Sequence, residues 1–522
     1  MELDIFSLLK EKAQVYPLGV LDKYDDELYI KVGLKDFRAA CLFLHQFLKS
    51  PVEMLFAQDQ CREQKEFTVT CVFAGIKYRK WIFVSIDIPQ DLARFDALSK
   101  EIYSAALFER EIKEMFGLTP EGSLDLRSLN LHDEVWPEKA YPLLKSFSAP
   151  KSIAPKGEYK FAKVQGDGVF EVPVGPVHAG IIGPGHFRFS VAGEPIINLE
   201  IRLGFTHRGI EKILEAKNIF DAVNIAERVS GDSSFAHSLA FCQAVEKICG
   251  LTAPHRALYL RGIMLELERM YNHVNDIGGI AVDVGFSFPA ALASIIKESI
   301  LQLNFKLAGS RYLKGINTIG GLTKDIEDVD LLLKTLESIE KDFKRLLDIL
   351  NASVSFMDRV DNTGVLKRKT AEDFGVVGLA ARACGIPTDL RRYFPGVYSI
   401  VKFNMAREQK GDVLARLKVR YFEFQESCRL IKEFLKILPK GEVKTKDFEI
   451  KEGFGLGFVE AWRGPVLYWI KIDAKGRIER CKIVDPSYRN WQGLSYAVLG
   501  DIIPDFPVSN KSFDLSYSGN DL

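Results

Sequence analysis

The first 145 residues alternate helix-like stretches with short apolar runs rich in β-branched and aromatic residues. The runs ELYIKV, FTVTCVFAG and WIFVSIDIP have the residue types that strands favour. This pattern predicts an α+β domain over residues 1–145. The next segment, SFSAPKSIAPKGEYK, is rich in Ser, Pro, Lys and Gly and lacks apolar periodicity, which predicts a linker or surface strap over residues 146–165.

The remaining residues, 166–522, contain long stretches in which apolar side chains recur at helical spacing. Three of them, 256–277, 330–350 and 413–438, predict helices that bury one face against other helices, as in a helix bundle. Near the end, GLGFVEAW, VLYWIKI and RIERCKIV are separated by turn signals, and DAKG predicts a hairpin between the last two. The predicted fold class is therefore α+β: an N-terminal α+β domain joined to a large, mainly helical domain with a C-terminal β-hairpin region.

Composition excludes some functions. The 522 residues include 70 basic and 70 acidic side chains, so no long-range field would gather nucleic acid, and no nucleic-acid partner is expected. The start, MELDIFSLLKEKAQVYP, is acidic and broken by charges, unlike a signal peptide, which predicts an unprocessed cytoplasmic chain. The best apolar run is interrupted by Asp283 and Pro289, so membrane contact is expected only through partners. The eight cysteines form no C-x-x-C pair and are predicted to be reduced, packed thiols.

One string in the first domain carries a family resemblance. FEREIKEMFGLTPEGSLDLRSLNL, followed by YPLLK, contains E-R-E-x-x-x-M-F-G and D-L-R. It resembles the 30-kDa subunit, the smaller of the two hydrophilic subunits in the connecting module of complex I. Because that family uses this domain as scaffold, the resemblance implies an ion-pair network that docks the domain onto its neighbours, formed by Glu109, Arg110, Glu111, Asp125 and Arg127.

A second resemblance begins at Gly175. GPVHAGIIGPGHFRF, LGFTHRGIEK, ERVSGDSSFAHSLAFCQAVE and RGIMLELERMYNHVNDIG follow one another in this order, and EAWRG and NKSFDLSYSGNDL come later. The order resembles the large subunits of energy-converting (group 4) membrane-bound nickel-iron hydrogenases and their complex I relative, the 49-kDa subunit. Fusion of both parts into one chain is similar to the arrangement in formate-hydrogenlyase-type complexes.

Hydrogenases of this family bind nickel and iron through two C-x-x-C pairs. Arg228 and His237 keep the first motif in register, and the four positions that correspond to the cysteines hold Ser230, Ser233, Ser516 and Gly519. Nickel in such a site needs soft thiolates. A serine hydroxyl does not replace a thiolate, and glycine offers no ligand. The resemblance therefore implies that this chain holds no metal and is not a hydrogenase.

Several polar residues of the family's site remain. Glu211 matches a glutamate that passes protons to and from the metal, and burial is expected to raise its pKa. Arg463 matches an arginine that faces the diatomic iron ligands, and its guanidinium could instead bind an anionic or carbonyl oxygen. Simpler roles stay open: Glu211 pairs with Arg208 or caps a helix, and Arg463 braces the hairpin.

The complex I relative uses the equivalent cavity, with a His and a Tyr, to bind quinone. His178 is placed near that cavity, but the tyrosine position falls at Gly231, followed by Asp232, so quinone is a candidate without its most informative residue. A lone histidine on a packed helix is more often a satisfied core residue. The predicted catalytic residues are Glu211, His178 and His237, and the predicted cavity residues are Arg228, His207, Arg382, Arg463 and Asp514.

The resemblance implies a subunit of a membrane-associated respiratory oxidoreductase complex on the inner face of the cell membrane. The chain has no cluster motif of its own, so electrons are expected from an iron–sulfur cluster in a small partner subunit. They would pass to quinone or another small acceptor, and antiporter-like and other membrane subunits would couple this step to ion translocation. The rival hypothesis is a catalytically silent scaffold or coupling subunit of such a complex.

Overall fold

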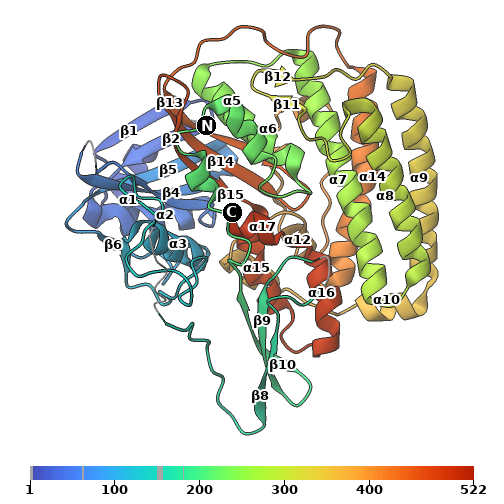
Figure 1. Cartoon of the computed structure of the whole chain (residues 1–522), viewed down its shortest axis with the longest axis horizontal. Helices are drawn as coiled ribbons and strands as arrows, with labels where there is room; N and C mark the ends of the chain where they lie inside the picture. Colours follow the sequence, from blue (N-terminus) through green and yellow to red (C-terminus); the bar gives the residue numbers. More distant parts are fainter. Residues whose placement is uncertain (1–3, 62–63, 150–156, 180–181) are drawn as a thin grey trace.

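A computed structural model describes residues 4–61, 64–149, 157–179 and 182–522. The chain begins with a five-stranded sheet of order β1-β2-β5-β4-β3, in which β2 and β5 are parallel and the other neighbours antiparallel (Figure 1). Its elements are α1 (Ile5–Ala13), β1 (Gly19–Tyr24), β2 (Glu27–Lys31), α2 (Phe37–Leu48), β3 (Met54–Asp59), β4 (Glu66–Gly75), β5 (Lys80–Pro89) and α3 (Ala106–Phe116).

The central strands of this sheet are buried on both faces. Nine of the ten residues of β4 are buried, which suits its continuous apolar run. The same hydrophobic core includes Leu456, Leu467 and Trp469 from near the other end of the chain. The hydrophobic core beside the N-terminal sheet is therefore completed by C-terminal residues, and the boundary at residue 145 stays a prediction.

Four long helices lie side by side at the opposite end of the molecule (Figure 1). They are α7 (His255–Asp283), α8 (Ser287–Ala308), α9 (Val329–Ala352) and α14 (Val413–Lys436). Asp328 and Asp412 cap the starts of α9 and α14, accepting hydrogen bonds from Leu331 N at 2.8 Å and Ala415 N at 2.7 Å. The helix bundle and the α+β fold class are confirmed.

A three-stranded antiparallel sheet, β13 (Gly453–Glu460), β14 (Pro465–Ile472) and β15 (Ile478–Val484), lies between the N-terminal sheet and the bundle (Figure 1). The predicted hairpin at DAKG joins β14 to β15. Helix α6 (Ser234–Cys249) packs on β13 so closely that a Cβ at Gly457 would lie 2.0 Å from Ala240 O. Only glycine permits this approach, which brings the residues before α6 next to the loop after β13.

A third sheet, β8 (Val169–Val174), β9 (His186–Ala192) and β10 (Ile196–Arg202), projects from the molecule (Figure 1). Seven of the predicted linker residues, 150–156, lie outside the described residues. Beyond them the chain runs along this sheet, where Ala162 N donates to Glu200 Oε2 at 2.7 Å. Short helices follow, namely α4 (Ile210–Leu214), α5 (Ile219–Ala226), α10 (Val354–Val360), α11 (Arg368–Asp373), α12 (Gly378–Ala383), α13 (Leu390–Tyr393), α15 (Pro486–Ala497), α16 (Phe506–Phe513) and α17 (Tyr517–Asp521).

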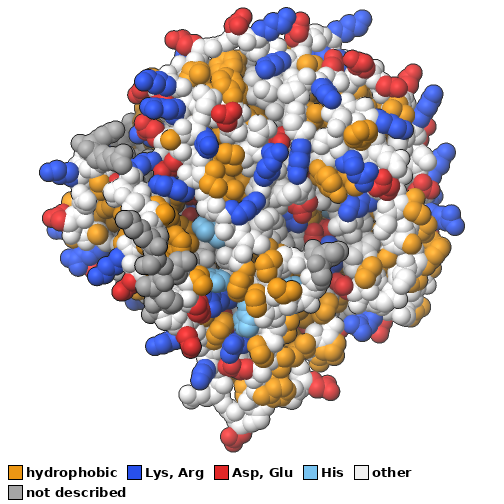
Figure 2. Space-filling view, in the orientation of Figure 1, with side chains coloured by type: hydrophobic (Ala, Val, Ile, Leu, Met, Phe, Trp, Pro, Cys, Tyr) orange, Lys and Arg blue, Asp and Glu red, His pale blue; other side chains and the backbone are white. Residues whose placement is uncertain are grey.

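The visible face carries side chains of both charges, interspersed, while apolar side chains gather around the projecting sheet (Figure 2). Exposed apolar residues of this region include Phe170, Val177 and Ile197. Among the helices of the described ranges, none is long and apolar enough to cross a membrane. The apolar run noted in the sequence is divided between the end of α7 and the start of α8.

Candidate functional site

The structure brings together the four positions that correspond to the metal-binding cysteines. Ser230 Oγ lies 2.8 Å from Ser516 Oγ, although 286 residues separate them in the sequence. Ser516 is the N-cap of α17, and its hydroxyl accepts a hydrogen bond from Gly519 N at 2.9 Å. Ser233 Oγ accepts one from Trp462 Nε1 at 3.0 Å. We define the serine cluster as Ser230, Asp232, Ser233, Arg463, Ser516 and Gly519.

An ion pair occupies the centre of the serine cluster. Arg463 donates from Nη1 to Asp232 Oδ1 at 2.9 Å and from Nη2 to Asp232 Oδ2 at 2.6 Å, a bidentate geometry. The guanidinium also stacks on Trp462, 3.9 Å from the ring centroid. Burial opposes the charge on Asp232, but Arg463 outweighs it and holds the pKa of this carboxyl below its ordinary value. Ser230 Oγ donates to Asp232 Oδ1 at 2.7 Å, so the pair also orients the serine hydroxyls.

Further charges extend the serine cluster toward the helix bundle. Lys511 Nζ lies 2.6 Å from Asp514 Oδ1 and 3.6 Å from Asp276 Oδ1 on α7. Burial and the charge of Asp514 raise the pKa of Asp276 to about 7. The lysine stem crosses α7 at Gly279, where a Cβ would lie 2.1 Å from Lys511 Cε. Acidic and basic side chains therefore alternate from Asp232 through Arg463, Asp514 and Lys511 to Asp276.

The position of the fourth cysteine has no room for a side chain. A Cβ at Gly519 would lie 2.6 Å from Asp485 Cγ. Asp485 accepts a hydrogen bond from His237 Nε2 at 3.0 Å, and His237 Nδ1 lies 2.9 Å from Tyr468 Oη. His237 is fully buried with both ring nitrogens bonded. It therefore supports Asp485 and Tyr468 instead of facing an open cavity.

The donor atoms of the serine cluster do not fit a nickel-iron centre. They are hydroxyls and a backbone position where the family has thiolates. Within the described residues, no group of three or more His, Cys, Asp or Glu side chains could hold a metal ion.

Glu211 lies on α4 and faces the C-terminal sheet. Its carboxylate accepts hydrogen bonds from Arg480 Nη1 at 2.6 Å and Ile483 N at 3.0 Å, and Lys482 Nζ lies 3.3 Å away. Burial opposes its charge, but Arg480 and Lys482 outweigh burial, so the pKa of Glu211 is lowered. The expectation of a raised pKa was wrong, because two cations from β15 surround the carboxylate. Arg208 is not the partner, since it donates to backbone carbonyls, including Val229 O at 2.8 Å.

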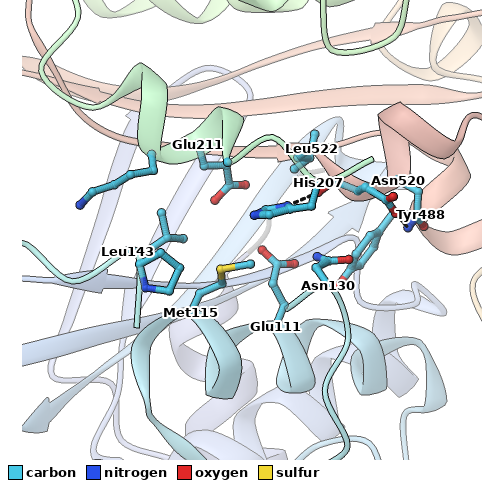
Figure 3. A pocket seen from close by; sticks show the side chains of 13 residues that line it. Glu111, Met115, Asn130, Leu143, His207, Glu211, Tyr488, Asn520 and Leu522 are labelled. Carbon is cyan, nitrogen blue, oxygen red and sulfur yellow. Dashed lines mark hydrogen bonds between the residues drawn. The ribbon is translucent and has the colours of Figure 1, made fainter. Parts of the chain in front are cut away.

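Glu211 borders a small cavity between the N-terminal domain and the rest of the chain (Figure 3). The cavity has a volume of about 30 Å³. Glu111 on α3 points into it from one side and Glu211 from the other, with the ring of His207 between them. His207 donates from Nδ1 to Asp521 O at 2.6 Å, which leaves Nε2 as an acceptor. We call this space the interdomain cavity; it is lined in part by Glu111, Asn130, His207, Glu211 and Tyr488.

Comparisons with known proteins agree with this architecture. The family model of the 30-kDa subunit of respiratory-chain NADH dehydrogenase matches residues 30–152, and that of the 49-kDa subunit matches residues 283–454 and 444–521. The nickel-dependent hydrogenase model matches residues 208–276, which include Glu211 and Ser230. Formate hydrogenlyase subunit 5 of Escherichia coli is 31% identical, with 97% of this chain and 92% of the relative covered. The chain belongs to the family of group 4 hydrogenase-type large subunits.

Other relatives agree with this assignment. Hydrogenase-4 component G of Escherichia coli is 32% identical over 97% of this chain and 90% of its own length. NADH-quinone oxidoreductase subunit 4 of Thermus thermophilus is 30% identical over 69% of this chain and 95% of its own length. A chain of the membrane-bound sulfane sulfur reductase, an archaeal respiratory membrane complex, has a TM-score of 0.64 and 25% identity, covering 68% of this chain and 98% of that one. The relatives of this chain are thus subunits of membrane respiratory complexes.

The structure places the other predicted site residues in different surroundings. His178 lies beside the serine cluster, with Nε2 3.2 Å from Tyr517 Oη. Asp514 touches Arg463 at 3.3 Å and belongs to the charged extension. Arg228 is exposed and donates to Asn224 O, away from the cluster. Arg382 is fully buried in a separate network, where it donates to Glu423 and Glu460, each at 2.8 Å.

The motif residues of the 30-kDa-like domain divide into two groups. Lys482 of β15 donates to Glu111, and Arg127 Nη1 donates to Glu200 Oε1 at 2.6 Å. Each of these two ion pairs joins the 30-kDa-like domain to the second part of the chain. Glu109 instead accepts from Ser99 Oγ at 2.6 Å within its own domain. The predicted docking network therefore includes Glu111 and Arg127, while Glu109 braces a loop.

Sequence reasoning missed several members of the site. Asp276 and Lys511 lie within the family strings RGIMLELERMYNHVNDIG and NKSFDLSYSGNDL but were not singled out, and Arg480, Lys482 and Asp485 lie in none of the family strings. Asp232 was noted only as the residue after Gly231, yet it holds the centre of the serine cluster. Its signal was available: an acidic residue between two serines at cysteine positions can supply the negative charge that thiolates would otherwise carry.

Proposed function

We propose that this chain is a subunit of a membrane-associated respiratory oxidoreductase complex and not a nickel-iron hydrogenase. In this proposal it takes part in electron transfer to quinone or another small acceptor, coupled to ion translocation. The observation that supports the absence of a nickel-iron centre is the serine cluster, in which three hydroxyls and a glycine stand at the four positions that correspond to cysteines. The proposed role in a respiratory oxidoreductase complex is supported by membership of a family whose relatives are parts of membrane respiratory complexes.

We infer that the cofactor and partners lie outside this chain. Its sequence has no cluster motif, so the electrons would come from an iron–sulfur cluster in a small partner subunit. Antiporter-like and other membrane subunits would complete the complex and hold this chain peripherally on the inner face of the membrane. The family relationship supports this arrangement, since the relatives include subunits of formate hydrogenlyase and NADH-quinone oxidoreductase.

In this proposal, Glu211 exchanges protons and Arg463 binds the acceptor. Glu211 is held as a carboxylate by Arg480 and Lys482, so it would take up a proton only when charge moves nearby. Arg463 would have to exchange its bond to Asp232 for one to an anionic or carbonyl oxygen of the acceptor. His178 and Tyr517 lie beside this position and would contact an acceptor that enters there.

The purified complex tests the proposal. Metal analysis by mass spectrometry should find no stoichiometric nickel, and a viologen-linked assay should show no uptake or production of hydrogen. The same dye, once reduced, should support reduction of a quinone or a sulfur compound. About one nickel per chain together with hydrogen uptake would overturn the claim that the chain is not a nickel-iron hydrogenase. Absence of any reductase activity would overturn its proposed part in electron transfer.

The alternative function is a catalytically silent coupling subunit. One observation favours it: every polar group at the centre of the serine cluster already has a partner from the chain itself. Glu211→Gln separates the two functions, because loss of a positioned acid–base group lowers turnover by about 10²-fold or more. If electron transfer survives both this change and Arg463→Lys, the coupling role holds instead of the redox role.

A further inference from the structure

The interdomain cavity contains buried polar atoms without partners. Among the described residues, Glu111 Oε2 and Asn130 Oδ1 are buried without a hydrogen bond of ordinary geometry, and Tyr488 Oη, which also lacks one, lies close enough to Glu111 to interact with its carboxylate. All three residues are more than nine-tenths buried and line the same space. Unpartnered buried polar atoms are rare in folded proteins and need an explanation. Here they lie together at one end of the cavity (Figure 3).

One ordered water would satisfy all three atoms. The cavity volume of about 30 Å³ exceeds the roughly 10–15 Å³ that a buried water requires. Such a water can donate to Asn130 Oδ1 and to the Glu111 carboxylate and accept from the Tyr488 hydroxyl, and when Glu111 carries a proton the water accepts from Glu111 and can turn that hydrogen toward Glu211, which lines the same space. Burial and the charge of Glu111 hold the pKa of Tyr488 well above its ordinary value, so this hydroxyl keeps its proton. Three hydrogen bonds are the usual number for a buried water.

The opposite end of the cavity reaches Glu211. Lys482 Nζ donates to Glu111 Oε1 and lies 3.3 Å from Glu211 Oε1, so one ammonium joins a carboxylate from each part of the chain. His207 extends between the two carboxylates and offers Nε2 to the same space (Figure 3). Other charged side chains that border the cavity or its two carboxylates are Arg480, Lys212 and Asp521.

We propose that Glu111, in the 30-kDa-like domain, is a proton-exchange residue that works with Glu211 through water in the interdomain cavity. A proton held by the Glu111 carboxyl passes to the water, which releases one of its own protons to Glu211. The water is unchanged, Glu211 becomes neutral, and Glu111 returns to a carboxylate that binds the next proton from solvent. This inference rests on the proposed role of Glu211 and adds a residue from the domain otherwise regarded as scaffold.

The test compares Glu111→Gln with Glu211→Gln in the purified complex, using reduced viologen as donor and a quinone as acceptor. Glu111→Gln should lower turnover at least about 10-fold, and it should increase the solvent deuterium isotope effect because proton delivery becomes limiting. Its thermal midpoint should fall, because the change breaks a buried ion pair with Lys482, but the fold should persist since Lys482 keeps Glu211 as a partner. Glu121→Gln, which removes an exposed carboxylate of the same domain, should leave all three quantities unchanged.

Further variants separate the possible failures. If Glu211→Gln slows turnover and Glu111→Gln does not, this inference is wrong and the role of Glu211 survives. If neither slows it, the proton-exchange part of the proposed function fails as well. Should Glu111→Gln fold poorly, Asn130→Leu removes one water partner and leaves the Glu111–Lys482 pair intact; wild-type turnover and isotope effect in Asn130→Leu would overturn the inference. A high-resolution structure of the complex with a dry cavity would also overturn it.

Discussion

The serine cluster and the interdomain cavity differ in whether their polar side-chain atoms find partners within the chain. In the serine cluster, Arg463 saturates both oxygens of Asp232, and the hydroxyls of Ser230 and Ser516 bond each other. In the interdomain cavity, one oxygen of Glu111 and the side-chain oxygen of Asn130 have no partner. The first region is closed by its own side chains, whereas the second has space and free acceptors for water.

This difference separates charged groups that stabilise the fold from carboxylates that we propose exchange protons. A buried ion pair repays its desolvation only when its geometry is good and its remaining atoms are bonded, and then it resists change. Glu111 and Glu211 are also held in buried pairs, by Lys482 and Arg480, but they border a water-sized space through which a proton can reach them. We therefore expect changes in the serine cluster to alter stability most, and changes at the cavity to alter turnover.

The largest effect on stability should come from Arg463→Ala. The change removes a buried guanidinium from Asp232, whose own side chain is 36% exposed. Water screens part of the lost pairing, so the loss of unfolding free energy should lie toward the lower end of the about 3–5 kcal/mol that breaking a fully buried pair costs. Arg94→Ala is the matched control, because it breaks an exposed pair with Glu121 and should cost less than about 1 kcal/mol. Urea titration measures both. Similar losses in the two variants would show that the serine cluster is not closed as described.

A smaller loss is expected for Gly519→Cys, which restores a family cysteine. Its Cβ would lie 2.6 Å from Asp485 Cγ, so neighbouring side chains must move, at about 1–3 kcal/mol for overpacking. Ser516→Cys places a thiol where a hydroxyl already fits and should cost less. Thermal unfolding compares the two. If Gly519→Cys is as stable as Ser516→Cys, the Asp485 side chain moves aside at little cost in free energy, and a variant with all four cysteines could hold metal.

The pH dependence of stability should change in Asp276→Asn. The ordinary pKa of this carboxyl is 3.8, and in the folded chain it is about 7. Between these values the folded chain binds more protons than the unfolded chain, so the contribution of Asp276 is complete below about pH 3.8 and is lost as the pH rises through 7. Asp276→Asn should therefore make unfolding midpoints fall less steeply between pH 4 and 7. An identical slope in the two proteins would mean that Asp276 ionises normally.

The smallest effect should come from Arg228→Ala. This side chain is exposed and faces away from both regions, although the family motif gives it a place in the site. Unfolding free energy should change by less than about 0.5 kcal/mol, and dye-linked turnover should match wild type. A loss comparable to that of Arg463→Ala would connect Arg228 to the serine cluster through a partner subunit.

Local patterning predicted most of the architecture. Long apolar stripes marked α7, α9 and α14, and the DAKG turn marked the hairpin between β14 and β15, because period and turn chemistry act over a few residues. Motif order likewise indicated the family and the loss of the four cysteines. Those features depend on residue type and short spacing, which one sequence carries in full.

Only the tertiary structure decided which side chains pair at the positions of the lost cysteines and which carboxylates border the interdomain cavity. Asp232 and Arg463 are 231 residues apart, and Glu111 and Lys482 are 371 apart, so no local pattern pairs them. The same limit explains the error at Glu211: burial is visible in an apolar context, but the cations of β15 that lower its pKa are not. Side-chain identity came from the sequence, and the balance between desolvation and neighbouring charge came from packing, since both act through space.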